Sequence, residues 1–341
     1  MSREPVRCAI VGLGRIGSLL ERDARREKPC THAGAVVGNP DCRLVGGCDT
    51  DAERRAEFTR DWGCTVVCAG IDELLEASRP DILCVATHPD SHRLMVERAL
   101  AHGVRVAVCE KPLADTLRNA RAIARLHQSG RITVVTNHER RYSADYRRAR
   151  EIVCGGQYGD LVAVRAALYF GRTAPHDRVL LHDGTHIVDI INYLTGGELK
   201  ASGRFGALRS NRSSVWLAAT GGAAPGGKPR TGVPVMVEVG AERDHLVFEV
   251  ELSLERGRVT VGNGVFRVEE SQESPFYEGY RSLVDTGEKR PEVTGYFSGM
   301  MADAVACLRE PGRAPVSSAR DGLAVMRFIR SAGSRLQRAI W

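Results

Sequence analysis

The strongest constraint on the fold of this chain is a glycine turn that directly follows a short apolar strand. The stretch VGLGRIG at residues 11–17 places Gly12, Gly14 and Gly17 in the spacing G-x-G-x-x-G. Between a strand and a helix, the first glycine permits a tight turn and the second lets a pyrophosphate approach the backbone. The third allows close packing of the helix, whose N-terminus then faces the phosphates. Alone the motif is weak, and its significance depends on the strands and helices that come after it in the chain.

Six apolar segments alternate with helix-like segments over the first 137 residues. The apolar segments are VRCAIVGLG, RLVGGCD, CTVVCA, DILCVAT, VRVAVCE and RITVVTN. Between them, IDELLEAS and SHRLMVERALAHG carry apolar residues at spacings of three and four, which indicates helices. Short buried strands separated by helices are typical of a parallel sheet covered on both faces. We therefore expect an α/β chain that begins with a doubly wound Rossmann domain, over residues 1–140, that binds a dinucleotide.

The pattern changes after about residue 155. Longer, alternating segments such as DHLVFEVELSLERGRVTVGNGVFRVEE, with ERGR and GNG as turns, predict a mainly antiparallel open sheet. We expect one helix over residues 184–195 and two more after about residue 295. The expected second domain is therefore of the α+β class and covers residues 141–341, and its last helices can pack back on the first domain. The Gly- and Pro-rich stretch 221–232 is predicted to be a hairpin loop.

Composition excludes several classes of protein. The 341 residues are 43% apolar and 26% charged, as in globular proteins, and no apolar run is long enough for a bilayer. The first residues lead into a strand without a signal-peptide core. Ten cysteines without a C-x-x-C pair indicate reduced thiols and a cytoplasmic protein. The densest arginine cluster, ERRYSADYRRAR at 139–150, is interpreted as a solvated helix face rather than a nucleic-acid patch.

The second strand ends in Asp49, whose carboxylate can accept both ribose hydroxyl groups of NAD. A 2′-phosphate at about 4 Å would be repelled by roughly 4 kcal/mol at an effective dielectric of 20, so we expect NAD rather than NADP. Residues 21–42 lengthen the first crossover beyond the usual ~20 residues. This insertion is either a surface loop or, through KPCTHAG at 28–34, a segment that orders over the cleft when ligands bind.

Four further motifs come after the glycine turn in a fixed order. They are THPDSH at 87–92, EKPL at 110–113, NHERRY at 137–142, and DGTHIVD at 183–189. As an ordered set they resemble the glucose-fructose oxidoreductase and inositol dehydrogenase family over nearly the whole chain. The resemblance implies a Rossmann domain for a nicotinamide cofactor and a C-terminal domain that holds the substrate. It also implies a homo-oligomer, a dimer or tetramer, formed through the C-terminal sheet, with neither a nucleic acid nor a membrane as partner.

The same resemblance assigns residues to the site. Lys111 corresponds to the family's active-site lysine, Pro112 to its proline and His186 to its catalytic histidine. Cofactor contacts are also expected from residues of the glycine turn and the strand ends, namely Arg15, Ile16, Thr87, His88, Pro89, His92 and Glu110. In the turn before His92, a helix cap by Asp90 or Ser91 is the structural alternative. Arg140, Tyr169 and Arg172 are candidate substrate contacts, for which surface or packing roles are the simpler interpretation.

The chain departs from the family before the catalytic histidine. Relatives commonly carry an aspartate four residues earlier, where this chain has His182, followed by Asp183. If the segment is helical, His182 and His186 share a face, and these side chains could form a proton relay or, with Cys30 and His32 nearby, a zinc site. Asp183 is turned by about 100° from His182 on a helix, so we expect the relay and no metal.

The chemistry of alcohol oxidation agrees with these residues. Removing a hydride from a secondary alcohol leaves an oxygen that must lose its proton, which requires a base and a cation for the developing charge. His186 and Lys111 supply them. We therefore expect an NAD-dependent dehydrogenase of a ring hydroxyl in a sugar, sugar derivative or cyclitol. The alternatives are a redox-assisted elimination or glycoside cleavage that recycles NAD, and a nicotinamide-sensing regulator without turnover.

Overall fold

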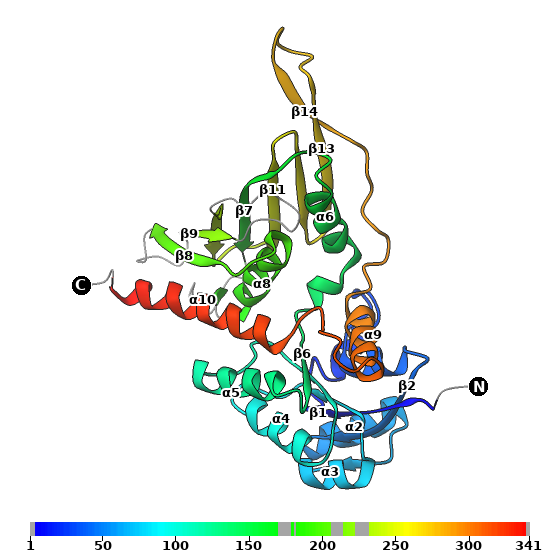
Figure 1. The fold of residues 1–341 in the computed structure, drawn as a ribbon. Coiled ribbons are helices and arrows are strands. Elements are labelled where there is room, and N and C mark those ends of the chain that lie inside the picture. Colours follow the sequence, from blue (N-terminus) through cyan, green and yellow to red (C-terminus); the bar gives the residue numbers. More distant parts are fainter. Residues whose placement is uncertain (1–3, 170–178, 181, 206–213, 222–231, 339–341) are drawn as a thin grey trace. The chain divides into compact units, whose positions relative to one another are not determined.

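The structure is a computed structural model that describes residues 4–169, 179–180, 182–205, 214–221 and 232–338. The chain forms two compact units, one of residues 1–143 and 293–323 and the other of residues 144–292 and 324–341 (Figure 1). Arg172 and residues 222–231 of the loop predicted at 221–232 lie outside the described residues. Each unit is built around one sheet.

The sheet of the first unit is parallel, with strand order β3-β2-β1-β4-β5-β6. This is the order of a doubly wound dinucleotide-binding sheet, so the predicted Rossmann fold is confirmed. Its strands are β1 Val6–Val11, β2 Cys42–Cys48, β3 Val67–Cys68, β4 Ile82–Val85, β5 Val106–Cys109 and β6 Thr133–Thr136. Every strand is short, and the carboxyl ends of β1, β2, β4, β5 and β6 carry the candidate residues.

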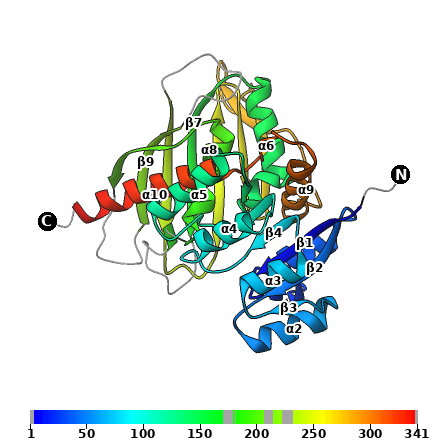
Figure 2. The same ribbon diagram turned by 60° about the horizontal axis from the view of Figure 1, so that its bottom comes forward.

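Helices from two parts of the chain cover this sheet. Along one face run α3 Ile71–Ser78, α4 His92–Ala101 and α5 Leu117–Gln128 (Figure 2). On the other face α1 His32–Val37, α2 Ala52–Trp62 and α9 Tyr296–Arg309 share one apolar core with the strands. The helix α1 is only six residues long, and α9 packs against it and covers β5 and β6 on the same face.

The insertion after the glycine turn is part of this core. The turn leads into a short 3₁₀ helix, η1 Leu19–Arg22, rather than the expected α-helix, and the crossover helix α1 comes ten residues later. Thr31 caps α1 by accepting a bond from the N–H of Gly34 at 3.0 Å. Residues 32–36 are buried, so the surface-loop interpretation is wrong for them. Their burial also argues against a segment that orders only when ligands bind.

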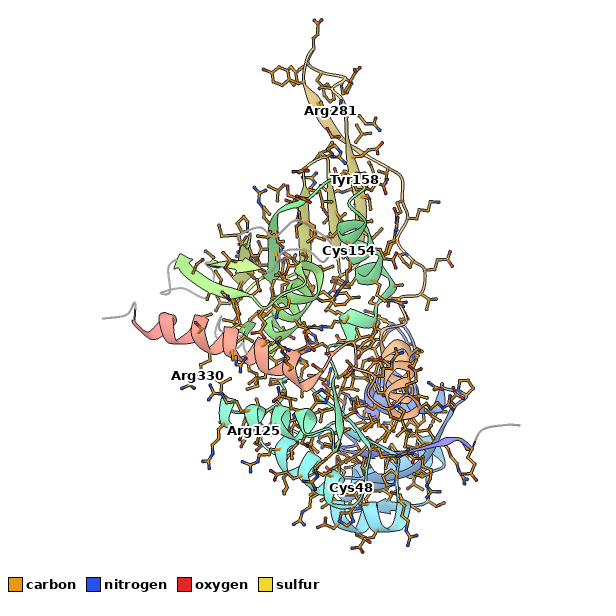
Figure 3. The ribbon with its side chains drawn as sticks, in the orientation of Figure 1. Cys48, Arg125, Cys154, Tyr158, Arg281 and Arg330 are labelled. Atoms are coloured by element: carbon orange, nitrogen blue, oxygen red, sulfur yellow. The ribbon has the colours of Figure 1, made fainter. Side chains whose placement is uncertain are left out.

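The second unit contains an eight-stranded sheet of order β14-β13-β12-β11-β7-β10-β9-β8. All neighbouring pairs are antiparallel except β7 and β10, which confirms the predicted mainly antiparallel sheet. Its strands are β7 Leu161–Tyr169, β8 Lys200–Phe205, β9 Ser214–Gly221, β10 Val233–Gly240, β11 Val247–Leu254, β12 Gly257–Gly262, β13 Val265–Glu273 and β14 Arg281–Asp285. The β13–β14 hairpin extends beyond the rest of this sheet, with Arg281 on its outer strand (Figure 3).

One face of the second sheet packs on helices and the other carries charges. The helices are α6 Ala144–Gly155, α8 Gly184–Thr195 and the part of α10 Ala319–Arg338 from residue 324 onward. The helix predicted over 184–195 and the two after 295 are thus confirmed. On the opposite face Arg258 pairs with Glu251 at 3.5 Å and Glu269 at 2.6 Å, and Arg165 lies 3.6 Å from Glu251.

The arginine-rich stretch 139–150 differs from its prediction. It begins as a 3₁₀ helix, η2 Glu139–Tyr142, and continues into α6. Arg141 is buried, where it donates to the carbonyl of Val316 at 2.9 Å and pairs with Asp321 at 3.1 Å. Asp145 and Tyr146 are buried as well. The interpretation as a solvated helix face is therefore wrong for part of the cluster, because partners far along the chain compensate its charges.

Two further predictions concern the whole chain. All ten cysteines are free thiols, eight of them buried. Among the described residues, no helix combines the length and apolar character needed to cross a bilayer.

Candidate active site

The glycine turn is shaped by backbone contacts that exclude side chains. Gly12 has φ +90°, and a Cβ there would lie 2.6 Å from the carbonyl of Ala86 and 2.8 Å from the nitrogen of Thr87. A Cβ on Gly17 would collide with the carbonyl oxygen of Gly12. These two positions therefore require glycine. The turn is pressed against the end of β4, and the structure brings Gly12 and Thr87 together as expected.

Asp49 connects this turn to the end of β2. It directly follows Cys48, the last residue of that strand (Figure 3). Its buried carboxylate accepts the N–H of Leu13 at 2.8 Å through Oδ2 and the N–H of Asp51 at 3.0 Å through Oδ1. The guanidinium of Arg54 lies 3.6 Å from Oδ2. Each carboxylate oxygen has two lone pairs, so Asp49 can still accept ribose hydroxyl groups while it supports the turn.

The turn after β4 is organised by a buried histidine. His92 lies with Nε2 at 3.0 Å from the carbonyl of Thr87 and Nδ1 at 3.3 Å from the carbonyl of Leu113. Burial lowers the pKa of His92, so its ring is neutral at pH 7 and donates to one carbonyl at a time. The alternative of a helix cap by Ser91 is not borne out, since its hydroxyl lies 2.7 Å from that of Thr87 and 2.9 Å from the carbonyl oxygen of His88. His92 thus lies between this turn and the segment after Lys111 and can bond to a carbonyl of either one.

Glu110, directly after β5, is the centre of a buried polar cluster. Its Oε1 lies 2.9 Å from Nε2 of His32 and accepts the side-chain amide of Asn137 at 2.5 Å. Its Oε2 accepts the backbone N–H of Lys111 at 3.2 Å. Cys109 and Thr136 pair in register at the ends of β5 and β6, so the next residue of each strand points to the same face. That face is the one covered by α1 and α9.

The charges in this cluster are coupled. Burial alone would lower the pKa of His32, but its interactions with the neighbouring Cys84 and Glu110 outweigh this effect and raise the pKa to about 10. Burial alone would raise the pKa of Glu110, yet the bonds and charges of His32 and Asn137, with the nearby Lys111, hold it below its usual value. The directions agree with an ion pair between His32 and Glu110.

Lys111 and Glu139 complete the polar edge of the first unit. Lys111 is half-buried at the end of β5, and its charge acts on both Glu110 and Glu139. Burial raises the pKa of Glu139, although the charges of Arg140 and Lys111 oppose the shift. Arg140 follows Glu139 on η2. A cation and a carboxyl with a raised pKa therefore lie at the same edge of the sheet as the glycine turn.

The second unit contains the segment around α8, which carries the other candidate catalytic residues. His186 is half-buried on the first turn of the helix, and its backbone N–H donates to the carbonyl of Asp183 at 3.1 Å. Asp183 is the N-cap residue, and its Oδ1 lies 3.3 Å from Nδ1 of the exposed His182. His182 therefore precedes α8, and the two histidines are not four apart on one continuous helix. The structure joins His182 with Asp183.

Tyr169 lies on the other face of the second sheet. It alternates with Leu168, which is buried in the core that α8 covers. Its ring packs edge-on against His245 at 6.2 Å between centroids and under the guanidinium of Arg243 at 5.1 Å. Burial and a hydrogen bond to Glu238 raise the pKa of Tyr169 to about 12. These contacts give Tyr169 a packing role and do not bring it to His186.

Comparison with known proteins identifies a family model that matches part of the chain. Residues 6–138 match the model of the GFO_IDH_MocA family, described as an oxidoreductase family with an NAD-binding Rossmann fold. The likeness to this family is thus established for residues 6–138. The resemblance noted in the sequence is thereby confirmed, and the domain is an NAD-binding Rossmann domain.

Curated relatives and solved structures extend the likeness. The chain is 26% identical over 199 residues to an inositol 2-dehydrogenase of Rhizobium meliloti, covering 57% of this chain and 56% of the relative. It is 30% identical over 162 residues to a D-apiose dehydrogenase of Paraburkholderia graminis, covering 45% and 43%. The chain thus spans about half the length of these relatives. A dehydrogenase structure from Chromobacterium violaceum matches with TM-score 0.77 at 17% identity, covering 99% and 98%, which supports the fold of both units.

Sequence reasoning missed four side chains of the first unit. Asn137, Glu139 and Phe297 were passed over, and His32 was considered only as a remote metal ligand. Asn137 and Glu139 sit in NHERRY directly after β6, a position that the strand register alone could have singled out. Phe297 packs edge-on against His32 at 5.7 Å between ring centroids, and its place on α9 had no sequence signal near the site. Among the described residues, no three His, Cys, Asp or Glu side chains cluster as metal ligands.

Proposed function

We propose that the protein is an NAD-dependent dehydrogenase that transfers a hydride between the cofactor and a ring secondary alcohol of a sugar, sugar derivative or cyclitol. The observation that carries the proposal is Lys111, held at the strand end beside Glu110 in a GFO_IDH_MocA domain. The names of the relatives, an inositol and an apiose dehydrogenase, favour polyhydroxylated substrates.

The chain's own residues have separate tasks in this reaction. The bound nicotinamide supplies the hydride acceptor. Lys111 stabilises negative charge on the substrate oxygen as the C–H bond breaks. His186 exchanges the hydroxyl proton as general base or acid, and Asp183 or His182 orients it or holds a neighbouring hydroxyl. Arg140, half-buried on η2, is a further substrate contact in this proposal.

NAD is the preferred cofactor in this proposal. In this proposal a pyrophosphate approaches the backbone of the glycine turn at Gly14, the second glycine of the motif. Asp49 disfavours a 2′-phosphate by charge repulsion, although Arg54 lies 3.6 Å from it and compensates part of that charge. Steady-state kinetics with each cofactor decides between them, and a higher kcat/KM with NADP would contradict the preference.

A substrate screen tests the activity. Purified protein is incubated with NAD and a panel of sugars, aminosugars, sugar phosphates and inositols, and NADH is followed by absorbance. We expect accumulation of NADH with at least one member of the panel and its loss in Lys111→Ala. Product formation without net NADH would instead support redox-assisted elimination or cleavage. Cofactor binding with no turnover on any member would support a nicotinamide-sensing regulator.

We also infer a homodimer or homotetramer that forms through the second sheet. The support is the face of that sheet opposite α6 and α8, on which Arg258 pairs with Glu251 and Glu269. Arg258→Glu places three negative charges together and is expected to dissociate the oligomer. Light scattering measures the mass of both proteins, and a monomeric wild type would refute the inference.

A further inference from the structure

The environment of Glu110 raises a question about Lys111. The buried Glu110 lies one residue before the lysine that the proposed function uses as a cation. A buried carboxylate strongly attracts a neighbouring ammonium group unless other groups compensate its charge. Without such groups, Glu110 would hold Lys111 at the strand end and reduce its effect on a substrate oxygen.

We propose that His32 is a positioning residue: as a buried imidazolium it neutralises Glu110 and thereby leaves the charge of Lys111 available to the reacting oxygen. The inference rests on the proposed function for the role of Lys111, but not for the ion pair itself. It deepens that function by assigning a role to a residue of the insertion, which the family's catalytic groups do not include.

Geometry supports an ion pair at this place. Nε2 of His32 lies 2.9 Å from Oε1 of Glu110, and the imidazole is 0% exposed while the carboxylate is 8% exposed. A charge-assisted bond shielded from water is stronger than its exposed equivalent. The groups that face His32 are Cys84 on β4, Glu110 after β5 and the ring edge of Phe297 on α9. Glu110 is the nearest anion, and the raised pKa of His32 agrees with a proton held there at neutral pH.

Neutral donors alone would not have the same effect. Asn137 and the backbone N–H of Lys111 satisfy lone pairs of Glu110 but carry no charge. The negative charge next to Lys111 is therefore compensated by His32. Nδ1 of His32 is buried without a hydrogen-bond partner among the described residues, so the bond through Nε2 is the one that orients the ring.

His32 also connects two places at the edge of the sheet. One is the reaction end, around Glu110 and Lys111, and the other is the cofactor end, around the glycine turn and Asp49. Its backbone N–H donates to the carbonyl of Ile16 at 3.1 Å, and that of Ala33 donates to the carbonyl of Gly17 at 3.0 Å. One residue therefore touches the glycine turn through its backbone and Glu110 through its side chain. A side-chain substitution removes the second contact and leaves the first, so the two roles can be separated.

The protonation state of His32 is tested on the wild-type protein without a substrate. Histidine is labelled with ¹⁵N, and the ring nitrogens are observed by NMR across neutral pH, with the His32 signals identified by their absence in His32→Gln. We expect both nitrogens of His32 to be protonated. A neutral ring would overturn the proposal, whatever the activity of the protein.

The effect on Lys111 is tested by rescue. His32→Gln keeps a donor near Glu110 but removes the charge, and we expect hydride transfer in single turnovers to fall about tenfold with NAD affinity unchanged. His32→Gln combined with Glu110→Gln removes both charges and should restore the rate to within about threefold of wild type. Additive losses in the double variant would show a merely structural role and overturn the proposal.

A matched control addresses folding. His127 on α5 lies in the same unit and accepts the N–H of Val134 at 3.1 Å, away from Glu110. His127→Gln should leave hydride transfer at the wild-type rate. If the wild type transfers no hydride to any alcohol in the panel, the proposed function fails while the NMR result still decides the ion pair. A loss in His127→Gln equal to that in His32→Gln would overturn the specific role of His32.

Discussion

Asp49 and Glu110 are two buried carboxylates at the ends of strands in the same sheet, yet they are held in different ways. Asp49 accepts two backbone N–H groups, from Leu13 and Asp51. Glu110 is held chiefly by the side chains of His32 and Asn137, which come from α1 and the end of β6. The carboxylate of the cofactor end is thus held by backbone donors, and that of the reaction end by side chains from other segments.

This difference has functional consequences. Backbone donors stay in place whatever the neighbouring side chains are, which suits a turn that must present a fixed surface to a dinucleotide. Side-chain donors add charge, and charge is what a catalytic lysine responds to. We therefore expect substitutions at the cofactor end to change binding and stability, and substitutions at the reaction end to change the rate.

Lys111→Ala is expected to give the largest effect and tests whether the two ends are separable. Its charge matters mainly when the oxyanion forms, so turnover should fall by about 100-fold or more while NAD affinity stays near wild type. Isothermal titration and single-turnover hydride transfer measure the two quantities. Near wild-type chemistry would leave the lysine as an ordinary strand end.

Asp49→Asn tests the backbone-held carboxylate. An amide offers one acceptor oxygen, so one of the N–H groups of Leu13 and Asp51 would face an NH₂ group. We expect NAD to bind about tenfold more weakly and the protein to lose stability, since a buried donor is left unsatisfied. Asp51→Asn is the matched control, because a single oxygen of Asp51 accepts both N–H bonds of its helix cap. Equal losses in both variants would contradict a special role for Asp49.

The pH dependence of stability tests the ion pair of the reaction end. The pKa of His32 is raised from 6.5 to about 10 in the folded protein. Its contribution to stability is therefore complete below pH 6.5 and is lost as the pH rises towards 10. Relative to His32→Gln, the free energy of unfolding of the wild type should fall by up to about 1.4 kcal/mol per pH unit in this window.

Urea denaturation of both proteins across the window measures this difference. At acid pH, Glu110 has the opposite effect on the pH dependence of the free energy of unfolding. Its pKa is lowered from 4.5, so its contribution is present above that pH and is lost as the pH falls through its lower folded value. Parallel stability curves for wild type and His32→Gln above pH 6.5 would show that His32 is neutral in the folded state.

The parts that the sequence predicted are those that depend on local periodicity. The six short strands, the glycine turn and α8 follow from apolar patterns within a few residues. The cluster around Glu110 does not, because His32 is 78 residues away from it and Phe297 is on a helix near the end of the chain. A six-residue helix such as α1 has too few turns to show a helical period, so its sequence HAGAVV could not be distinguished from a loop.

Charged residues were misjudged for a related reason. Arg141 has its partners 175 and 180 positions further along, in Val316 and Asp321, and nothing near it in sequence indicates burial. The interruption between His182 and α8 depends on where the helix begins, which spacing alone could not locate. Predictions from sequence were therefore reliable for elements and weaker for the polar contacts between them.

A third carboxylate gives the smallest expected effect and sharpens the comparison. Glu27, in the insertion, accepts the N–H of Thr294 at 3.0 Å and that of Gly295 at 2.7 Å, at the N-terminus of α9. Like Asp49, it is held by backbone donors. It lies at the N-terminus of α9, however, and not beside the glycine turn. Its loss should therefore affect stability alone.

Glu27→Gln is expected to lower the free energy of unfolding by about 1 kcal/mol, because the charge at the helix N-terminus and one acceptor oxygen are removed. Glu76→Gln, on the exposed side of α3, is the matched control and should change stability by less than about 0.5 kcal/mol. Urea denaturation gives both values, and NAD affinity should be unchanged in each variant. A change in NAD affinity for Glu27→Gln would mean that the insertion also affects cofactor binding. The division between carboxylates that serve the fold and carboxylates that serve the site would then not hold for this unit.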